Sequence, residues 1–293
     1  MQSTIDQLLK YQHTKQTDAP FLIFPERSET VSYAQLLSAV TQVAGLLKRL
    51  GVAHGQKVAL LLPNIPEFIY FYWGAMSIGA VACPINTLLK GPEIEYITNH
   101  CEAVVFVTTP EFLPIIQSVA DQFEQVKNIV LVPDSVVPSG DTAISLPITA
   151  FRMHQLTAEY QNLELSSLQS QPVLPDDDAM IIYTSGTTGK PKGVVLTHHN
   201  LITDARYITE WFGFSAQTRF MNILPLFHVN GEVVTLMTPL FCGGSVVLNR
   251  KFSASNFWPY IAQYQVNVFS TVPTILSLLL NQIGRASCRE RVS

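Results

Sequence analysis

Apolar residues recur at helical spacing between residues 30 and 51, with polar residues in the positions between them. The repeating apolar positions are Leu36, Val40, Val43, Leu47 and Leu50. Spacings of three and four residues place these side chains on one side of a helix. Ser32 is suited to cap the start of that helix, and Gly51 is typical of a helix end. The pattern therefore predicts an amphipathic helix over this segment.

Shorter apolar runs follow, and they alternate with further helical patterns. We predict buried strands over residues 57–62, 80–85, 103–107, 129–132, 221–224, 245–248 and 266–270. We predict helices over residues 66–77, from Pro92 onward, and over 111–125, 150–160, 200–212, 233–241, 253–264 and 273–281. Strands that are apolar throughout and alternate with helices are typical of a parallel sheet covered on both faces. The sequence therefore predicts an α/β fold.

The alternation also suggests how the chain is divided. Residues 133–175 are rich in Pro, Ser, Gln and Asp, and we interpret them as connecting structure. They lie between a first α/β unit, residues 1–174, and a second unit, residues 175–283. Residues 284–293 hold three arginines and no apolar periodicity. We predict that they form a non-native or disordered tail, and that the native reading frame stops near Ile283.

A segment rich in hydroxyl groups and glycine stands between two apolar runs at residues 180–196, MIIYTSGTTGKPKGVVL. It contains the hydroxyl residues Thr184, Ser185, Thr187 and Thr188, the glycines Gly186 and Gly189, and the lysines Lys190 and Lys192. Glycine permits close approach of the backbone to an anion, and hydroxyl, backbone N–H and ammonium groups bind phosphate oxygens. The segment therefore predicts a strand–loop–strand unit that binds a polyphosphate.

Two other interpretations of this segment fit its residues less well. The Walker A pattern of P-loop NTPases needs four residues between its glycines and a Ser or Thr directly after its lysine. Here Gly186 and Gly189 are three apart, and Pro191 stands where that hydroxyl residue belongs. A flexible surface linker is also disfavoured, because linkers rarely lie between two strongly apolar strand-like runs.

Composition narrows the class of protein. Of the 293 residues, 47% are hydrophobic and 14% are charged, which predicts a large core and a modestly charged surface. The net charge of −4 and the lack of long Lys or Arg runs argue against nucleic-acid binding. Cys83, Cys101, Cys242 and Cys288 lie far apart without a CxxC pair. We therefore predict reduced thiols in a cytoplasmic protein, and no metal site formed by protein ligands.

Membrane insertion is not predicted. The first residues show no signal peptide, since no basic segment precedes an apolar stretch. Residues 68–83 carry no charge, but a spanning helix needs about 20 apolar residues and Pro84 ends the run. We expect no integral membrane span, while peripheral contact with a membrane stays open.

A second motif, LPLFHVNG at residues 224–231, follows a predicted strand and contains His228. Together with the string at residues 183–194, it resembles the adenylate-forming (AMP-binding) superfamily of acyl-CoA synthetases, aryl-CoA ligases, luciferases and peptide-synthetase adenylation domains. The resemblance extends over about residues 30 to 283. It implies two doubly wound, mostly parallel sheets with helices on both faces. This is the large N-terminal domain of those enzymes, truncated and without their small C-terminal domain.

The resemblance also implies roles for individual residues. Those implied to hold the β- and γ-phosphates of ATP are Thr184, Ser185, Gly186, Thr187, Thr188, Gly189, Lys190 and Lys192. Catalytic roles are implied for Lys192, Thr188 and His228, through positioning and charge neutralisation. His228 would gate the acyl pocket and contact the acyl carboxylate. We favour Lys192 over Lys190 for the pyrophosphate contact, because Pro191–Lys192–Gly193 is the more constrained part of the motif.

The function implied by the resemblance is that of an AMP-forming acyl-CoA synthetase, a ligase that uses ATP, Mg²⁺ and coenzyme A. Its substrate would be a small-molecule carboxylic acid, and the apolar residues around His228 and Val272 favour a fatty or other hydrophobic acid. Two alternatives stay open. One is an adenylation domain that loads a carrier protein, and the other is a non-catalytic fragment that binds nucleotide phosphates.

Some motifs of the superfamily have no counterpart in this chain. They are a Thr-Glu motif whose glutamate helps to bind magnesium, a downstream aspartate that holds the ribose hydroxyls, and a C-terminal lysine that contacts the acyl-adenylate. In the superfamily these motifs follow the region that this chain resembles. We therefore interpret the chain as an N-terminal fragment, and we predict that it is catalytically inactive as written.

Overall fold

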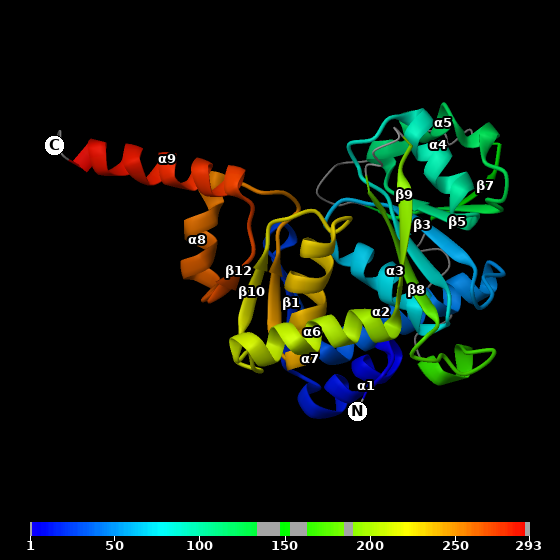
Figure 1. Ribbon diagram of the computed structural model, residues 1–293, viewed down its shortest axis with the longest axis horizontal. Coiled ribbons are helices and arrows are strands. Elements are labelled where there is room, and N and C mark those ends of the chain that lie inside the picture. Colours follow the sequence, from blue (N-terminus) through cyan, green and yellow to red (C-terminus); the bar gives the residue numbers. More distant parts are fainter. Residues whose placement is uncertain (1, 134–146, 153–162, 185–189, 291–293) are drawn as a thin grey trace.

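The computed structural model describes residues 2–133, 147–152, 163–184 and 190–290, and it places their strands in two sheets (Figure 1). The larger sheet has the order β7-β6-β5-β3-β4-β8-β9, formed by Thr149–Arg152, Asn128–Leu131, Ala103–Thr108, Lys57–Leu61, Val81–Pro84, Asp178–Thr184 and Lys192–Thr197. The smaller sheet has the order β12-β10-β11-β1-β2, formed by Val268–Phe269, Arg219–Asn222, Ser245–Leu248, Pro20–Phe24 and Glu29–Ser32. Neighbouring strands are parallel except in the pairs β1–β2 and β8–β9.

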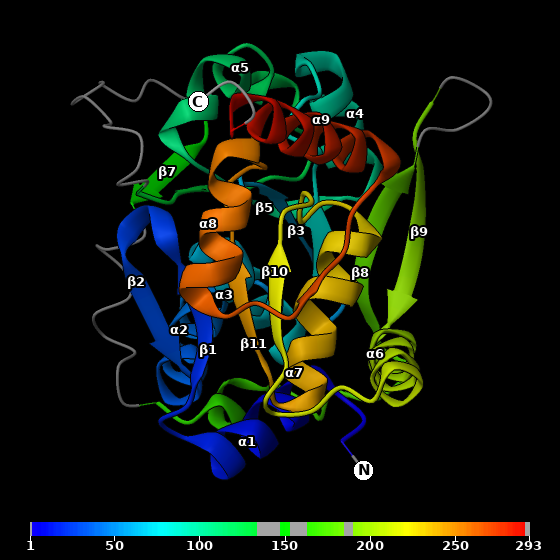
Figure 2. The ribbon, with the colours of Figure 1, turned by 90° about the vertical axis from the view of Figure 1, so that its left-hand side faces the viewer.

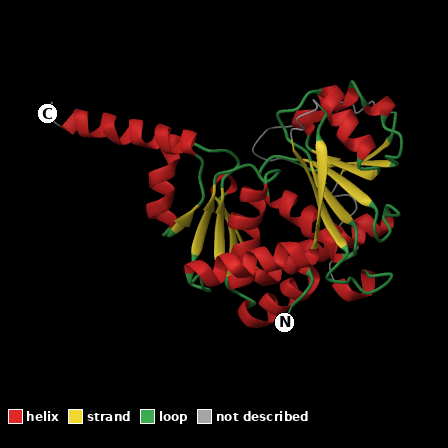
Figure 3. Cartoon of the chain, in the orientation of Figure 1, coloured by secondary structure: helices red, strands yellow, loops and turns green. Residues whose placement is uncertain are grey.

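Helices fill the space between the two sheets and cover their outer faces (Figures 2 and 3). One apolar cluster joins both sheets to α1 (Ile5–Gln16), α2 (Tyr33–Arg49), α3 (Pro66–Ser77), α6 (His198–Phe212) and α7 (Thr238–Cys242). A second cluster packs α4 (Gly91–His100) and α5 (Leu113–Gln117) on the other face of the larger sheet. A third packs α8 (Ala254–Tyr264) and α9 (Pro273–Glu290) on the outer face of the smaller sheet. This confirms the predicted class of mostly parallel sheets with helices on both faces.

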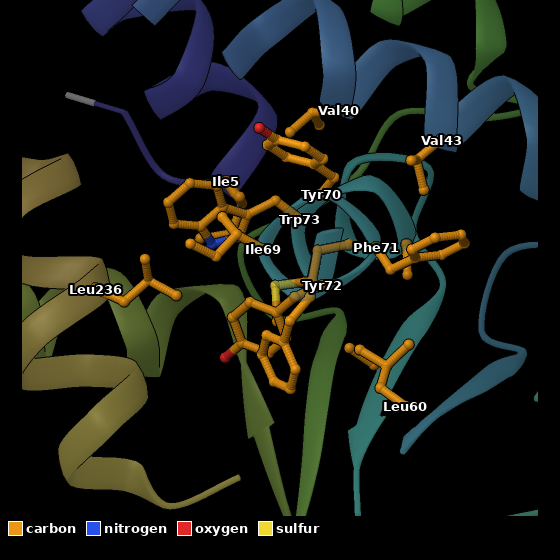
Figure 4. Packing of buried hydrophobic residues seen from close by; sticks show 14 of the residues in the cluster. Ile5, Val40, Val43, Leu60, Ile69, Tyr70, Phe71, Tyr72, Trp73 and Leu236 are labelled. Carbon is orange, nitrogen blue, oxygen red and sulfur yellow. The ribbon is translucent and has the colours of Figure 1, made fainter. Parts of the chain in front are cut away.

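Helix α3 lies at the centre of the core, because its side chains are apolar around the whole circumference. Phe71, Tyr72 and Trp73 are fully buried, and residues of α1, α2, β3 and the segment near Leu236 surround them (Figure 4). The uncharged stretch 68–83 therefore forms a buried helix and the buried strand β4. No helix in the part of the chain that the structure describes is long and apolar enough to cross a bilayer.

Several predicted elements match the structure within a few residues. Helix α3 has the predicted bounds, and β3, β4, β5, β6 and β11 lie in the apolar runs predicted as strands. Helix α2 begins with a capping box, in which Gln35 N–H donates to Ser32 Oγ and the Gln35 side chain accepts from Ser32 N–H. The sequence analysis missed α1, β1 and β2, although β1 is the apolar run Pro20–Phe24.

Two predicted helices take a different form. The helix expected over 111–125 is divided into short turns around α5, since Pro114 has no N–H to continue a helical hydrogen-bond pattern. The helix expected over 233–241 begins as a π-helix, η7 (Asn230–Met237), in which Thr238 N–H bonds to Val233 O five residues back. Most of the helix expected over 150–160 lies outside the described residues, and 149–152 form β7.

Each sheet contains strands from both sides of the boundary that we predicted at residue 175. Strands β1 and β2 belong to the smaller sheet, whereas β8 and β9, which follow residue 175, complete the larger one. The division into units 1–174 and 175–283 stays a prediction. Helix α9 continues to Glu290, and side chains beyond Asn281 lie outside the described residues. The origin of residues 284–293 therefore also stays a prediction.

Candidate functional site

The hairpin β8–β9 carries the segment predicted to bind phosphate (Figure 1). Its antiparallel register sets Thr184 opposite Lys192 and Tyr183 opposite Gly193. Five of the predicted phosphate-binding residues lie outside the described residues: Ser185, Gly186, Thr187, Thr188 and Gly189. Thr184, Lys190 and Lys192 are described and exposed. The structure therefore brings two of the predicted residues, Thr184 and Lys192, together as a cross-strand pair where the hairpin opens.

Gly193 is a glycine because of close packing within this hairpin. A Cβ atom at Gly193 would lie 2.9 Å from Ile181 Cγ2 and 3.2 Å from Cζ of the Tyr183 ring. The Tyr183 ring thus lies against the backbone of the opposite strand. This contact fixes the side chain that directly precedes Thr184.

The second motif forms a tight turn around His228, between β10 and η7. A Cβ atom at Gly231 would lie 2.3 Å from Pro225 O, so only glycine fits at that position. His228 N–H donates to Pro225 O at 3.2 Å, and Glu232 N–H donates to His228 O at 3.0 Å. The backbone around His228 is therefore closed by its own hydrogen bonds.

Two buried asparagines hold this turn in place. Asn64 Oδ1 accepts from Leu226 N–H at 2.9 Å, and Asn64 Nδ2 donates to Leu224 O at 2.9 Å. Asn222 Nδ2 donates to Gly231 O at 3.0 Å. The sequence analysis assigned no role to either residue. The available signal was an asparagine at the end of one apolar strand and another shortly after a second, where a buried amide needs partners.

A cleft of about 730 Å³ lies where the hairpin and the His228 turn meet. The hairpin contributes Ile182, Tyr183, Thr184 and Pro191, and the turn contributes Phe227, His228 and Val229. Pro84, at the end of β4, and Ile97, on α4, line it from the other side. The cleft thus opens at the carboxyl ends of parallel strands, which is the usual place for ligands in α/β sheets.

Two of the ionisable side chains that line the cleft are neutral, and the acidic residue Glu93 lines it as well. Burial lowers the pKa of His228, so its imidazole is uncharged near neutral pH. Burial is also the main cause that raises the pKa of Tyr183, so this phenol keeps its proton. The positive charge at the hairpin comes from Lys190 and Lys192. Within the described ranges, no cluster of three or more His, Cys, Asp or Glu residues is arranged to hold a metal ion.

One buried acid lies close to this turn. Glu232, on the first turn of η7, is fully buried, and both its carboxylate oxygens have no hydrogen-bond partner among the described residues. Burial raises its pKa well above the ordinary value of 4.5. Glu232 is therefore a neutral carboxylic acid, and it adds no charge to the site.

The sequence of the chain is similar to those of known enzymes. Residues 9–291 match the AMP-binding enzyme family. The chain is 31% identical over 261 residues to the crotonobetaine/carnitine–CoA ligase of Escherichia coli strain SE11, covering 88% of this chain and 48% of that protein.

Solved structures that resemble this chain are also CoA synthetases and CoA ligases. A fatty acyl CoA synthetase of Mycobacterium tuberculosis is 26% identical with a TM-score of 0.77, covering 94% of this chain and 51% of that one. The anthranilate CoA ligase AuaEII, in complex with anthranoyl-AMP, is 26% identical with a TM-score of 0.81, covering 94% and 52%. The chain therefore spans about half the length of the relatives that it matches.

Proposed function

The chain belongs to the AMP-binding enzyme family, and we propose that it is the N-terminal portion of an AMP-forming acyl-CoA synthetase. In the first step of this reaction, a carboxylate oxygen attacks the α-phosphorus of ATP, the bond to the β-phosphate oxygen breaks, and pyrophosphate leaves. In the second step, the thiol of coenzyme A loses its proton and attacks the carbonyl carbon, and AMP leaves. The names of the relatives, which are CoA ligases, favour coenzyme A over a carrier protein as acceptor.

One observation carries the proposal. The cleft is lined both by Thr184, at the start of the predicted phosphate segment, and by His228, in the predicted acyl-binding motif. These residues are 44 positions apart in the sequence; Thr184 ends β8 of the larger sheet, and His228 lies in the turn that follows β10 of the smaller sheet. A site that joins a carboxylate to an α-phosphate needs both kinds of group around one space. Their convergence supports adenylate formation more than either motif does by itself.

The proposed roles follow from these positions. Thr184 and Lys192, together with residues 185–189, hold the β- and γ-phosphates, and Lys190 adds positive charge beside them. Lys192 and Thr188 stabilise the charge that develops on the phosphates during attack. His228, as a neutral imidazole, donates a hydrogen bond to the acyl carboxylate and sets the entrance to the acyl pocket. Mg²⁺, when bound with ATP, would neutralise charge on the phosphates, and we propose no protein ligand for it.

The proposed substrate is a fatty or other hydrophobic carboxylic acid. Apolar side chains line most of the cleft around His228: Pro84, Leu89, Ile97, Ile182, Phe227 and Val229. Such walls favour an apolar chain over a charged one, because a charged group would lose its hydration there. We further propose that the protein acts in the cytoplasm on small molecules without binding nucleic acid, and that membrane contact is at most peripheral.

The test compares two proteins. The longer protein that carries this chain at its N-terminus should catalyse acid-dependent exchange of pyrophosphate into ATP and then form acyl-CoA, with a preference for apolar acids. The 293-residue chain by itself should bind polyphosphate without turnover. Carboxylate-dependent pyrophosphate release by the 293-residue chain would contradict the inactivity of the fragment. Pyrophosphate exchange without any transfer of the acyl group to coenzyme A would contradict the proposal that coenzyme A is the acceptor.

A further inference from the structure

One face of helix α4 contacts the β8–β9 hairpin on both sides of residues 185–189, which belong to the segment predicted to bind phosphate. Tyr96 and His100 are one helical turn apart on α4, and their ring centroids are 5.3 Å apart. Tyr183 ends the first side of the hairpin before Thr184, while Lys190 and Pro191 begin the second side. All five residues are described by the structure.

His100 contacts the first side. Its Nδ1 atom lies 2.7 Å from Tyr183 Oη, and the two rings meet edge to face at 5.7 Å. The Tyr183 hydroxyl group and His100 Nδ1 share one hydrogen bond, and the tautomer of His100 sets which of them donates. Behind Tyr183 lies Gly193, whose missing side chain leaves room for the Tyr183 ring. Tyr183 is therefore held between His100 and the opposite strand.

Tyr96 contacts the second side in two ways. Its hydroxyl group donates to Pro191 O at 3.4 Å. The ammonium group of Lys190 lies 5.4 Å from the centroid of the Tyr96 ring, which is the geometry of a cation–π contact. The exposed Lys190 side chain thus has its ammonium group placed over a half-buried aromatic ring. The contact reduces the number of conformations that Lys190 loses when it meets an anion.

We propose that Tyr96 and His100 are positioning residues for nucleotide phosphate, and that Tyr96 acts by holding the Lys190 ammonium group beside the phosphate-binding segment. Neither residue belongs to the motifs that carry the family resemblance. The inference rests on the proposed function, because it assumes that the hairpin binds the phosphates of ATP. It differs from that function in assigning part of the affinity to α4, a helix outside the hairpin.

The experiment uses the purified 293-residue chain and measures binding of inorganic tripolyphosphate, MgATP and AMP by calorimetry. Tyr96→Leu should weaken tripolyphosphate and MgATP binding about three- to tenfold. Tyr96→Phe keeps the ring and should stay within about twofold of the unchanged chain. The binding of AMP, which lacks the β- and γ-phosphates, should not change. Tyr11→Leu is the matched control, since it removes a similar contact of Lys15, at 5.7 Å, on α1.

A double-mutant cycle separates positioning from a purely structural role. If Tyr96 acts through Lys190, Tyr96→Leu should have no further effect on tripolyphosphate binding in a Lys190→Met background. His100→Ala and Tyr183→Phe should likewise be non-additive with each other. An undiminished effect of Tyr96→Leu in the Lys190→Met background would overturn the inference, and so would unchanged binding in Tyr96→Leu alone.

The same binding measurements distinguish failure of this inference from failure of the proposed function. Loss of binding in Lys192→Ala with unchanged binding in Tyr96→Leu would overturn the role of α4 and leave the phosphate site in place. If the unchanged chain binds neither tripolyphosphate nor MgATP, the hairpin is not a phosphate site. Both proposals would then fall together.

Discussion

Asn64 Nδ2 lies 3.2 Å from Asn222 Oδ1, and this hydrogen bond joins the segment after a strand of the larger sheet to the end of a strand of the smaller sheet. Asn64 follows β3 in the larger sheet, and Asn222 is the last residue of β10 in the smaller one. Both amides also bind the backbone of the turn that carries His228. The geometry of the cleft therefore depends on a buried polar contact between the two sheets.

Asn222→Ala should destabilise the protein and disturb the His228 turn. The substitution leaves Gly231 O and Thr235 Oγ1 without the amide that now contacts them. Thr235 Oγ1 would still donate to Gly231 O, so the cost comes from the lost hydrogen bonds themselves. At about 0.5–1.5 kcal/mol for each lost bond, we expect a loss of about 1–3 kcal/mol in the free energy of unfolding in urea. Asn256→Ala, on exposed helix α8, is the control and should change stability by less than about 0.5 kcal/mol. Equal effects of both substitutions would contradict this role of Asn222.

Lys192→Ala should remove most of the affinity for phosphate and preserve the fold. Lys192 is exposed on β9, so its loss creates no cavity. Hydrogen bonds to charged groups contribute about 1.5–3 kcal/mol, which corresponds to a loss of about ten- to a hundredfold in MgATP binding. Lys251→Ala, another exposed lysine, should have no effect on binding. Turnover of ATP that is unchanged by Lys192→Ala in the longer protein would exclude Lys192 from the site.

His228→Ala should change the handling of the acid more than that of ATP. The imidazole lines the cleft and is neutral, so we expect it to donate one hydrogen bond to the acyl carboxylate. Loss of one such bond is expected to raise the KM for the acid about five- to twentyfold in the longer protein. Steady-state kinetics with varied acid and varied ATP would separate the two effects. A change confined to the KM for ATP would show that His228 belongs to the nucleotide side.

The sequence predicted those elements in which local patterning and burial agree. Helix α3 and strand β3 were predicted because their apolar runs are long and end at proline or polar residues. The π-helix η7 was not predicted, since its hydrogen bonds follow a five-residue spacing that the apolar pattern does not encode. The pairing of β1 with β11 was not predicted either, because it joins Leu22 to Val246 across most of the chain.

The candidate site could also be predicted only in part from the sequence. Motifs identified Thr184, Lys192 and His228, and the structure places Thr184 and His228 on one cleft. No local pattern indicates that Asn64 meets Asn222, because the contact arises only after two sheets have packed together. The contacts of Tyr96 and His100 with the hairpin are of the same kind. The residues that we propose to carry chemistry were visible in the sequence, whereas the residues that contact and support them were not.

His198 should make the protein less stable in acid. It is fully buried at the start of α6, and its Nδ1 accepts from Ile5 N–H at 3.2 Å. Burial, together with His54, lowers the pKa of His198 to about 4, against the opposing effect of Asp6 and Asp177. The unfolded chain binds this proton below about pH 6.5, so stability should fall as the pH drops from there to about 4.

The expected loss over that window is about 3 kcal/mol. His198→Asn retains an acceptor for Ile5 N–H but cannot titrate, so this part of the acid sensitivity should disappear. Urea unfolding of both proteins at several pH values between 4 and 7 provides the comparison. His199→Asn changes an exposed neighbour and should keep the sensitivity. A parallel pH dependence in His198→Asn and the unchanged chain would contradict the assignment.

Glu232 should make the protein less stable as the pH rises above about 4.5. Burial raises its pKa in the folded protein, so above pH 4.5 the folded state holds a proton that the unfolded state has lost. The free energy of unfolding should therefore decrease by about 1.4 kcal/mol per pH unit from this group, starting near pH 4.5 and ending at its folded pKa. Glu232→Leu should remove this slope and raise stability at pH 7, because the leucine needs no hydrogen-bond partner.

Glu232→Gln separates the two causes, since glutamine cannot titrate but is still a buried polar group without partners. We expect it to lose the pH slope like Glu232→Leu and to remain less stable than Glu232→Leu. Urea unfolding between pH 5 and 8 measures both quantities. A slope that persists in both variants would mean that other groups cause the decrease at higher pH. A slope that persists only in Glu232→Gln would mean that Glu232 does not act through its proton.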